Sequence, residues 1–155
     1  MQITTISVKT TLGPGDWFTG TLYIDAVATP AGPTRLSASS VHFTPGARTA
    51  WHTHPNGQTV YVTEGVGRAQ CRGGQIEVIR PGDRVFFEPG EEHWHGAAPN
   101  RFMTHLAMLE VDDDGSAATW GRTSPTASTR PHHQATVESR LQAGPICPLG
   151  GPAAT

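Results

Sequence analysis

The chain has 155 residues, and its 11 basic and 13 acidic side chains leave a formal net charge of −2. This near balance gives no strong attraction to nucleic acid or to an anionic membrane surface, so we expect neither as a partner. No apolar run approaches the length of a membrane span, and the first residues lack the pattern of a signal peptide. The length favours a single domain with its own core.

Turn residues divide the chain into short extended segments. There are 18 glycines and 13 prolines, and the runs between them are rich in β-branched and aromatic residues. The first segments are predicted to be a strand or arm over residues 1–12 and strands over 17–28 and 36–44. Trp17 and Phe18 are expected to cap the core.

The second half of the chain continues this alternation of strands and turns. Further strands are predicted over residues 58–63, 66–72, 75–80, 84–88 and 102–111. The last of these places His105, Ala107 and Leu109 on one face, because side chains two apart along a strand point the same way. No helical period of useful length is visible. The pattern predicts an all-β protein with a closed or double-sheet structure.

The composition changes after residue 120. Residues 121–155 are rich in Ser, Thr, Pro, Ala and Gly and offer few side chains for a core, so we predict a flexible, low-complexity tail. Residues 1–120 are predicted to form one β-barrel domain with an N-terminal arm. Cys71 and Cys147 are expected to be unpaired thiols in a reducing cytosol, and we predict a cytoplasmic location.

The segment 46–67 carries the most informative pattern. His52 and His54 would project to the same side of an extended strand, and Gln58 follows a tight turn. A further imidazole, His93, follows a second turn-rich stretch. Neutral imidazole is the commonest metal ligand in proteins, so we predict a metal site formed by these three histidines and the Gln58 amide oxygen. The alternative is a group of surface histidines without a metal.

These residues also resemble known motifs. The spacing of Gly46, His52-x-His54, Gln58 and Gly65 is similar to the first motif of the cupins, with Gln where most cupins have Glu. The stretch from Gly82-Asp83 to Pro89-Gly90-x-x-His93 is similar to the second cupin motif. The resemblance implies a cupin, or jelly-roll, β-barrel.

A narrower resemblance covers roughly residues 14 to 120. The sequences GARTAWHTHPxGQT, PGExHWHGAAP and MTHLA, with Asp16-Trp17-Phe18-Thr19-Gly20 before them, resemble the small bacterial cupin hydroxynitrile lyases. This likeness implies a homodimer or homotetramer, in which the segment around Trp17 and Phe18 pairs with a partner subunit as the alternative to capping the core. It also implies a cyanohydrin or aldehyde substrate, aromatic or small and apolar. At the position of Leu109 that group carries a polar amide, so one hydrogen bond to substrate or cyanide is expected to be absent here.

The predicted ligands define the chemistry of the metal. Three imidazoles and one amide are all neutral, so the ion keeps its full double charge and favours Lewis-acid work. We expect one divalent transition metal per chain. The hard amide oxygen suits Mn(II) or Fe(II), while nitrogen-rich sites also take Ni, Cu or Zn.

Three further residues are candidates for catalysis. His105 is the preferred general base, because imidazole titrates near neutral pH, with a satisfied core histidine as the alternative. His95 shares a face with His93 and is expected to border the cavity, as a base or as a rim histidine. Thr49 is expected to donate a hydrogen bond from the segment before His52.

Three functions fit this pattern. The first is a carbon–carbon lyase that splits a cyanohydrin into aldehyde and cyanide, and catalyses the reverse reaction. The second is an Fe(II)-dependent dioxygenase, since three histidines with open positions are enough to bind oxygen and a chelating substrate. The third is a non-enzymatic cupin that binds metal or a small ligand.

Overall fold

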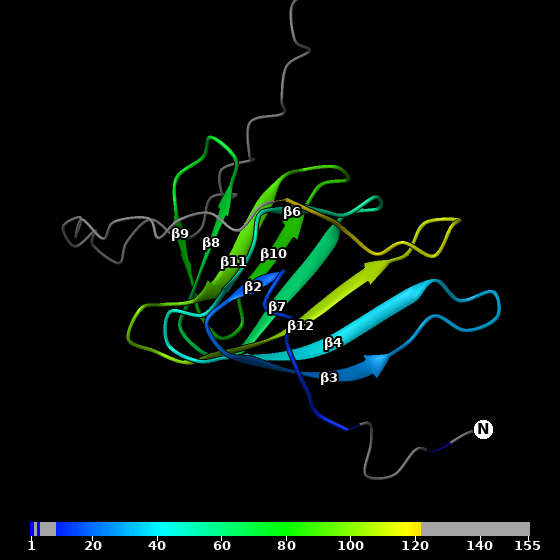
Figure 1. Ribbon diagram of the computed structural model, residues 1–155, viewed down its shortest axis with the longest axis horizontal. Helices are drawn as coiled ribbons and strands as arrows, with labels where there is room; N and C mark the ends of the chain where they lie inside the picture. The colour runs from blue at the N-terminus through cyan, green and yellow to red at the C-terminus, as the bar shows by residue number, and fades with distance from the viewer. Residues whose placement is uncertain (2, 4–8, 122–155) are drawn as a thin grey trace, which may run out of the picture.

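The computed structural model describes residues 1, 3 and 9–121, and these form strands and turns without any helix. The prediction of an all-β protein is therefore confirmed. Two antiparallel sheets curl toward each other into a half-barrel (Figure 1). The described residues contain no helix that is long and apolar enough to cross a membrane.

The first sheet has six strands. In spatial order they are β1 (Thr11–Leu12), β3 (Leu22–Ala28), β4 (Leu36–Phe43), β12 (Met103–Glu110), β7 (Gln58–Gly65) and β10 (Arg84–Phe87). The long strand β12 pairs with β4 on one side and β7 on the other. It therefore lies in the middle of the sheet, where its inward side chains face the interior of the half-barrel.

The second sheet has seven shorter strands. Its main path runs through β13 (Thr119–Trp120), β6 (His52–Thr53), β11 (His93–Ala97), β5 (Arg48–Thr49) and β2 (Phe18–Thr19). The strand β8 (Gly67–Cys71) pairs with β11 and with β9 (Glu77–Ile79). The strand β11 is central, because β5, β6 and β8 all pair with it.

Most predicted strands are present, with one correction near the N-terminus. The strand predicted over residues 17–28 is two strands, β2 in the second sheet and β3 in the first. Gly20 separates them at φ 78°, a left-handed conformation that interrupts an extended chain. Of the arm predicted over residues 1–12, only β1 is a described strand, and residues 2 and 4–8 lie outside the described part.

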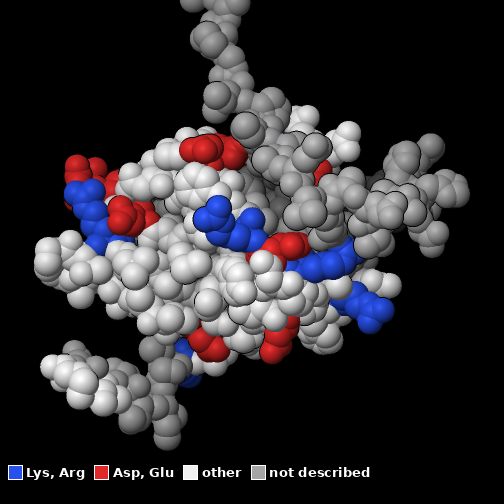
Figure 2. Space-filling view, turned by 180° about the vertical axis from the view of Figure 1, so that it is seen from behind, with Lys and Arg blue, Asp and Glu red and all other residues white. Residues whose placement is uncertain are grey.

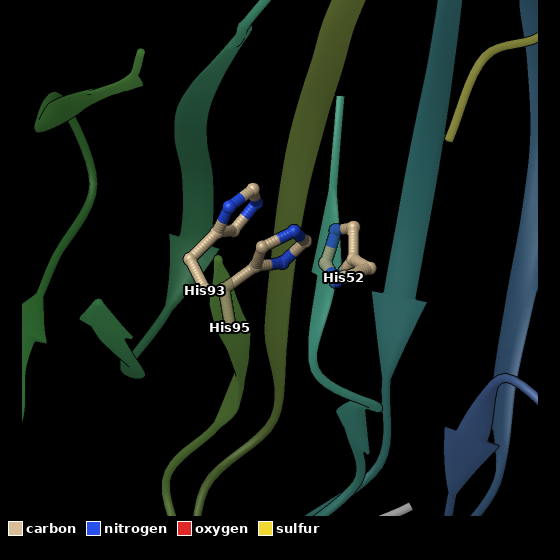
Figure 3. A group of neighbouring side chains, drawn as sticks. All are labelled: His52, His93 and His95. Carbon is tan, nitrogen blue, oxygen red and sulfur yellow. The ribbon is translucent and has the colours of Figure 1, made fainter. Parts of the chain in front are cut away.

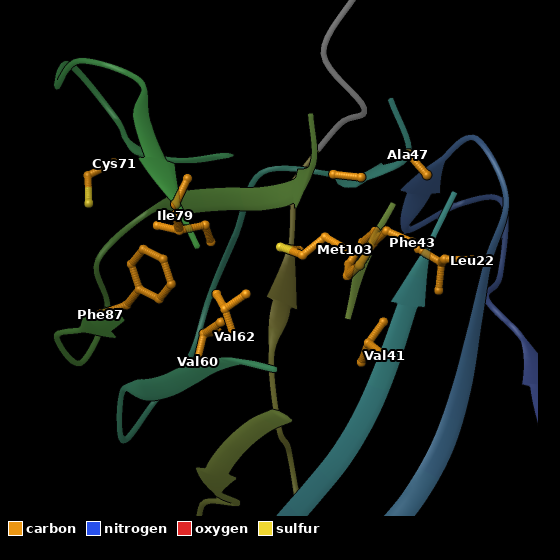
Figure 4. Packing of buried hydrophobic residues seen from close by; sticks show 12 residues of the cluster. Leu22, Val41, Phe43, Ala47, Val60, Val62, Cys71, Ile79, Phe87 and Met103 are labelled. Carbon is orange, nitrogen blue, oxygen red and sulfur yellow. The ribbon is translucent and has the colours of Figure 1, made fainter. Parts of the chain in front are cut away.

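The apolar core lies between the sheets. Alternation along β7 decides which side chains enter it: Val60 and Val62 are fully buried, whereas Tyr61 between them is 41% exposed. The core combines residues from both halves of the chain, including Leu22, Val41, Phe43, Val60, Val62, Ile79, Phe87 and Met103 (Figure 4).

The surface carries mixed charge. On the face in Figure 2, the described Lys and Arg side chains lie near Asp and Glu side chains. Arg72 is an example: it forms an ion pair with Glu92, and its guanidinium lies over the ring of Trp51 at 4.0 Å. The Glu92 side chain holds the pKa of the Arg72 guanidinium above its ordinary value.

Cys71 requires a correction. It was predicted to carry an unpaired thiol, but it is disulfide-bonded, and the described residues contain no free cysteine. Cys147, the other half of that prediction, lies outside the described residues. So does the predicted tail beyond Gly121, and the cytoplasmic location stays a prediction.

Candidate metal centre and pocket

Neighbouring strands place two of the predicted metal ligands next to each other. His52 on β6 and His93 on β11 are direct cross-strand partners, and their ring centroids lie 4.3 Å apart. The ligand atoms of His52, His93 and His95 all lie within 4.8 Å of one another. Figure 3 shows these rings grouped on the same side of the two strands. The spacing H-x-H on β11 explains this, because His93 and His95 share one face of the strand.

Hydrogen bonds anchor one ring nitrogen in each of three imidazoles. Each ring places Nδ1 against a backbone carbonyl: His52 against Ala50 at 2.9 Å, His54 against Ala117 at 2.7 Å and His93 against Glu91 at 2.8 Å. A carbonyl only accepts, so Nδ1 carries the hydrogen and Nε2 keeps its lone pair. The Nε2 atoms of His54 and His93 are buried without any hydrogen-bond partner.

Burial keeps these imidazoles neutral. It lowers the pKa of His52 from 6.5 to about 4 and that of His93 to about 2, with mutual repulsion adding to the effect. Burial also lowers the pKa of His54. A metal requires the neutral form of imidazole, so all three rings are ready to bind one at neutral pH.

A tight turn brings His54 and Gln58 together. Gly57 has φ 76°, and a Cβ added there would lie 2.6 Å from the Phe87 carbonyl oxygen, so only glycine fits. His54 lies near the other ligands, its ring centroid 4.9 Å from that of His52. The buried Gln58 begins β7 on the inward face that also carries Val60.

His95 differs from the other three histidines of these strands. Its Nε2 lies 3.2 Å from the Oε1 of Gln58, and its backbone N–H donates to the Thr49 hydroxyl at 3.1 Å. Its Nδ1 is buried without a partner. The cluster of close ligand nitrogens contains His95 rather than His54, whereas a hydrogen bond from Nδ1 to a carbonyl is shared by His52, His54 and His93. The side chain of Gln58 interacts with both His54 and His95, and the choice of His54 as a ligand stays a prediction.

The described residues fit a divalent metal. Neutral, buried nitrogens whose lone pairs have no hydrogen-bond partner are costly unless something fills the space between them. A cation shared by His54, His93 and their neighbours would satisfy these atoms, and their carbonyl anchors are the outer contacts typical of metal-bound histidines. Three histidines can thus hold a metal here, and its identity stays a prediction.

His105 faces the cluster from the other sheet. It is fully buried on β12, its ring centroid lies 4.9 Å from that of His95, and the ring of Phe43 lies 5.3 Å away. Neither of its ring nitrogens makes a well-formed hydrogen bond, although the backbone of His105 and Leu106 opposes the lowering of its pKa. Burial lowers the pKa of His105 to about 4, so the ring is neutral at pH 7 but a weaker base than the near-neutral imidazole expected from the sequence.

A cavity of about 330 Å³ contains this chemistry. Its polar wall consists of Thr49, His52, His54, Gln58 and His95. Its apolar wall comes mainly from β3, β4 and β12 and consists of Ile24, Val41, Phe43, Ala107 and Leu109, with Ser39 and His105 among them. The predicted catalytic residues His105, His95 and Thr49 all line it, as do three of the four predicted ligands.

Sequence reasoning missed Ala117 and Ala118 as part of the cavity wall. They line the cavity together with Trp17, Phe18 and Trp120. Trp17 and Phe18 thus cover the interior of their own chain, in agreement with the core-capping alternative. The sequence shows only that large aromatic residues stand at both ends of the barrel segment. It does not indicate that these side chains contact one another.

Comparisons with known proteins agree with this architecture. The family described as Cupin domain matches residues 39–108. An (R)-mandelonitrile lyase from Granulicella tundricola is 58% identical over 108 residues, which is 70% of this chain and 82% of that protein.

Solved structures support the same fold. A cupin-like protein from Thermotoga maritima superimposes with a TM-score of 0.70 at 35% identity, covering 77% of this chain and 90% of that one. The polyketide cyclase RemF from Streptomyces resistomycificus has a TM-score of 0.61 at 21% identity over 72% of this chain and 80% of its own, and this likeness concerns the fold alone.

Proposed function

Because this chain belongs to the cupin family, we propose that it is a metal-dependent hydroxynitrile lyase, which splits a cyanohydrin into an aldehyde and hydrogen cyanide. The observation that carries the proposal is the pairing of two groups in one cavity. One group is a set of anchored, neutral imidazoles suited to a cation. The other is His105, a buried neutral ring at the cavity wall whose nitrogens make no well-formed hydrogen bond. The 58% identity to an (R)-mandelonitrile lyase supports the choice of reaction.

The predicted ligands would be His52, His54, Gln58 and His93. A divalent metal bound there would act as a Lewis acid and lower the pKa of the substrate hydroxyl. The chain supplies no carboxylate among these four residues, so the charge of the ion is not offset. Mn(II) or Fe(II) suits the amide oxygen, and Ni or Zn suits the imidazoles.

The proton of the substrate hydroxyl goes to His105. This ring is neutral and borders the cavity, and neither nitrogen makes a well-formed hydrogen bond, so a hydroxyl in the cavity can donate to its lone pair. As the proton moves, the oxygen electrons form the aldehyde carbonyl, and the bond to the nitrile carbon breaks with its electron pair on cyanide. The protonated His105 then returns the proton to cyanide, which leaves as hydrogen cyanide.

Two polar groups would hold the substrate during this transfer. Thr49 accepts a hydrogen bond from the His95 amide, and its own hydroxyl hydrogen is not used in that bond. This hydrogen is available to a substrate oxygen or to the leaving anion. His95 keeps Gln58 in place through the contact at 3.2 Å, so its role is to orient a ligand or border the substrate.

The apolar wall sets the class of substrate. Val41, Ala107 and Leu109 present only hydrocarbon surface, and Phe18 with Trp120 adds aromatic faces at the other side of the cavity. Such walls favour an aromatic or small apolar substituent on the cyanohydrin. Leu109 offers no hydrogen bond to cyanide, which lowers the expected rate without removing either the base or the metal ligands.

The test is release of benzaldehyde from mandelonitrile by the purified, Mn(II)-loaded chain, measured with and without oxygen. We expect cleavage at the same rate in both conditions, because no step consumes oxygen. Oxygen uptake by the Fe(II)-loaded chain without cyanohydrin cleavage would instead identify the dioxygenase. Tight metal binding without cyanohydrin cleavage or oxygen uptake would favour the non-enzymatic binding protein.

A further inference from the structure

The segment 117–121 contacts two of the predicted ligands, although it follows the last long strand and lies outside the matched cupin residues. Trp120 pairs with His52 across β13 and β6. The carbonyl of Ala117 accepts the hydrogen bond from Nδ1 of His54 at 2.7 Å. The proposed metal centre therefore depends on a stretch of chain that neither histidine motif contains.

The indole of Trp120 stacks on an imidazole and on a second indole. Its ring centroid is 4.5 Å from that of His52, with an angle of 23° between the planes. The Trp17 ring is also stacked on Trp120, at 5.2 Å and 4°, and Phe18 packs against it edge-on at 5.5 Å. Trp120 thus stacks on both His52 and Trp17, and Trp17 is 43% exposed.

This stack restricts a motion that the hydrogen bond alone permits. His52 belongs to a strand of only two residues, and its ring is anchored at one atom, Nδ1, by the Ala50 carbonyl. A single bond to Nδ1 leaves the ring able to tilt about that contact. A flat aromatic face against the imidazole removes this freedom, because any tilt would lose the stacking contact.

We propose that Trp120, supported by Trp17, is a positioning residue that fixes the plane of the His52 imidazole and so directs its Nε2 at the metal. The inference rests on the proposed function, because it takes His52 as a ligand. Trp120 acts here through His52, as outer contacts of metal ligands generally do by limiting their orientation.

Variants of Trp120 distinguish the effect of a flat aromatic ring from the effect of apolar volume alone. Removing an outer contact of a ligand typically weakens metal affinity about 10- to 100-fold, and we expect that rise in the Kd for Mn(II) in Trp120→Ala. Trp120→Phe keeps a flat ring and should recover most of the affinity. Trp120→Leu keeps apolar bulk without a flat face and should resemble the alanine variant. Trp17→Ala should raise the Kd by a smaller factor.

The experiment is a titration of the metal-free full chain with Mn(II), in which electron paramagnetic resonance reports the free ion. The melting temperature of each metal-free variant is measured beside it, so that a loss of fold is recognised. Phe102→Ala is the control, because this aromatic residue is 65% exposed and does not line the cavity. Its Kd should equal that of the wild type.

The outcomes distinguish this inference from the proposed function. Weak binding by the leucine variant together with recovery in the phenylalanine variant supports the positioning role, since a merely structural role would treat the two alike. Equal Mn(II) affinity in wild type and Trp120→Leu overturns it and leaves the lyase proposal intact. A wild-type chain that binds no Mn(II) overturns both. If Trp120→Ala fails to fold, the comparison of the other two variants decides.

Discussion

The buried imidazoles on the two walls of the cavity differ in how their ring nitrogens are hydrogen-bonded. On the polar wall, His52 and His54 each anchor Nδ1 to a backbone carbonyl and, like the neighbouring His93, leave Nε2 for a shared cation. On the apolar wall, neither nitrogen of His105 makes a well-formed hydrogen bond, and the ring lies against Phe43. The comparison indicates that the anchored histidines are held in place to bind an ion, whereas the nitrogens of His105 remain available to a substrate.

The largest effects should come from the predicted metal ligands on and beside the polar wall. We expect His52→Ala or His93→Ala to lose the metal and to fall to the turnover of the metal-free chain, because each removes an anchored nitrogen ligand. His54→Ala should also lose the metal, whereas His95→Ala should keep it. Elemental analysis of each purified variant measures this.

The comparison between His54 and His95 decides the ligand set. Retention of metal in His54→Ala with loss in His95→Ala would mean that the tightest nitrogen cluster, rather than the Nδ1 anchors, marks the ligands. In that case the orienting role given to the contact between His95 and Gln58 would be wrong.

The apolar wall should respond differently. His105→Ala should keep its metal and lose about 10²- to 10⁴-fold in kcat, the range for removal of a general base. The matched control is His42→Ala on the outer face of the neighbouring strand β4, where the imidazole lies 3.0 Å from the Asp25 carboxylate. Steady-state kinetics with mandelonitrile provide the measurement. Loss of metal from the His105 variant would contradict the assignment of metal binding to the polar wall and of the general base to the apolar wall.

A charge change on the polar wall should have a smaller effect. Gln58→Glu should bind metal at least as tightly and lower kcat roughly tenfold, or about 1.4 kcal/mol, because the carboxylate offsets one unit of the ion's charge. Gln70→Glu is the control: its Oε1 accepts from the Trp94 indole away from the cavity. An unchanged kcat in Gln58→Glu, measured at full metal occupancy, would refute the argument from charge.

The smallest effect should come from adding a polar group to the apolar wall. Leu109→Gln places an amide at the cavity surface, and one new hydrogen bond to the leaving cyanide should raise kcat/KM several-fold, or about 1 kcal/mol. Val78→Gln, on the exposed strand β9, is the control. A decrease in kcat/KM for Leu109→Gln would show that this position is needed for apolar contact with the substrate.

The polar wall could be predicted from the sequence because its geometry is local. His52 and His54 are two apart and follow the period of an extended chain, and the same holds for His93 and His95. The turn before Gln58 requires glycine at Gly57, which the sequence displays directly. The inward face of β12, with His105 on it, followed from the same alternation.

The remaining parts depend on contacts between distant segments, which no local period encodes. The carbonyl that anchors His54 belongs to Ala117, 63 residues away. The stack of Trp17 on Trp120 joins the two ends of the described barrel. The predicted strand over residues 17–28 was wrong for a related reason, since the chain changes sheets at Gly20 and both halves have strand-like composition.

The most direct test of the whole account is to strip the chain of metal with a chelator and then restore Mn(II) in steps, with benzaldehyde release from mandelonitrile measured at each step. The account predicts no cleavage by the metal-free chain, and a rate that rises in proportion to bound metal and levels off at about one ion per chain, as a single shared site requires. Full cleavage by the metal-free chain, or none at full occupancy, would contradict it.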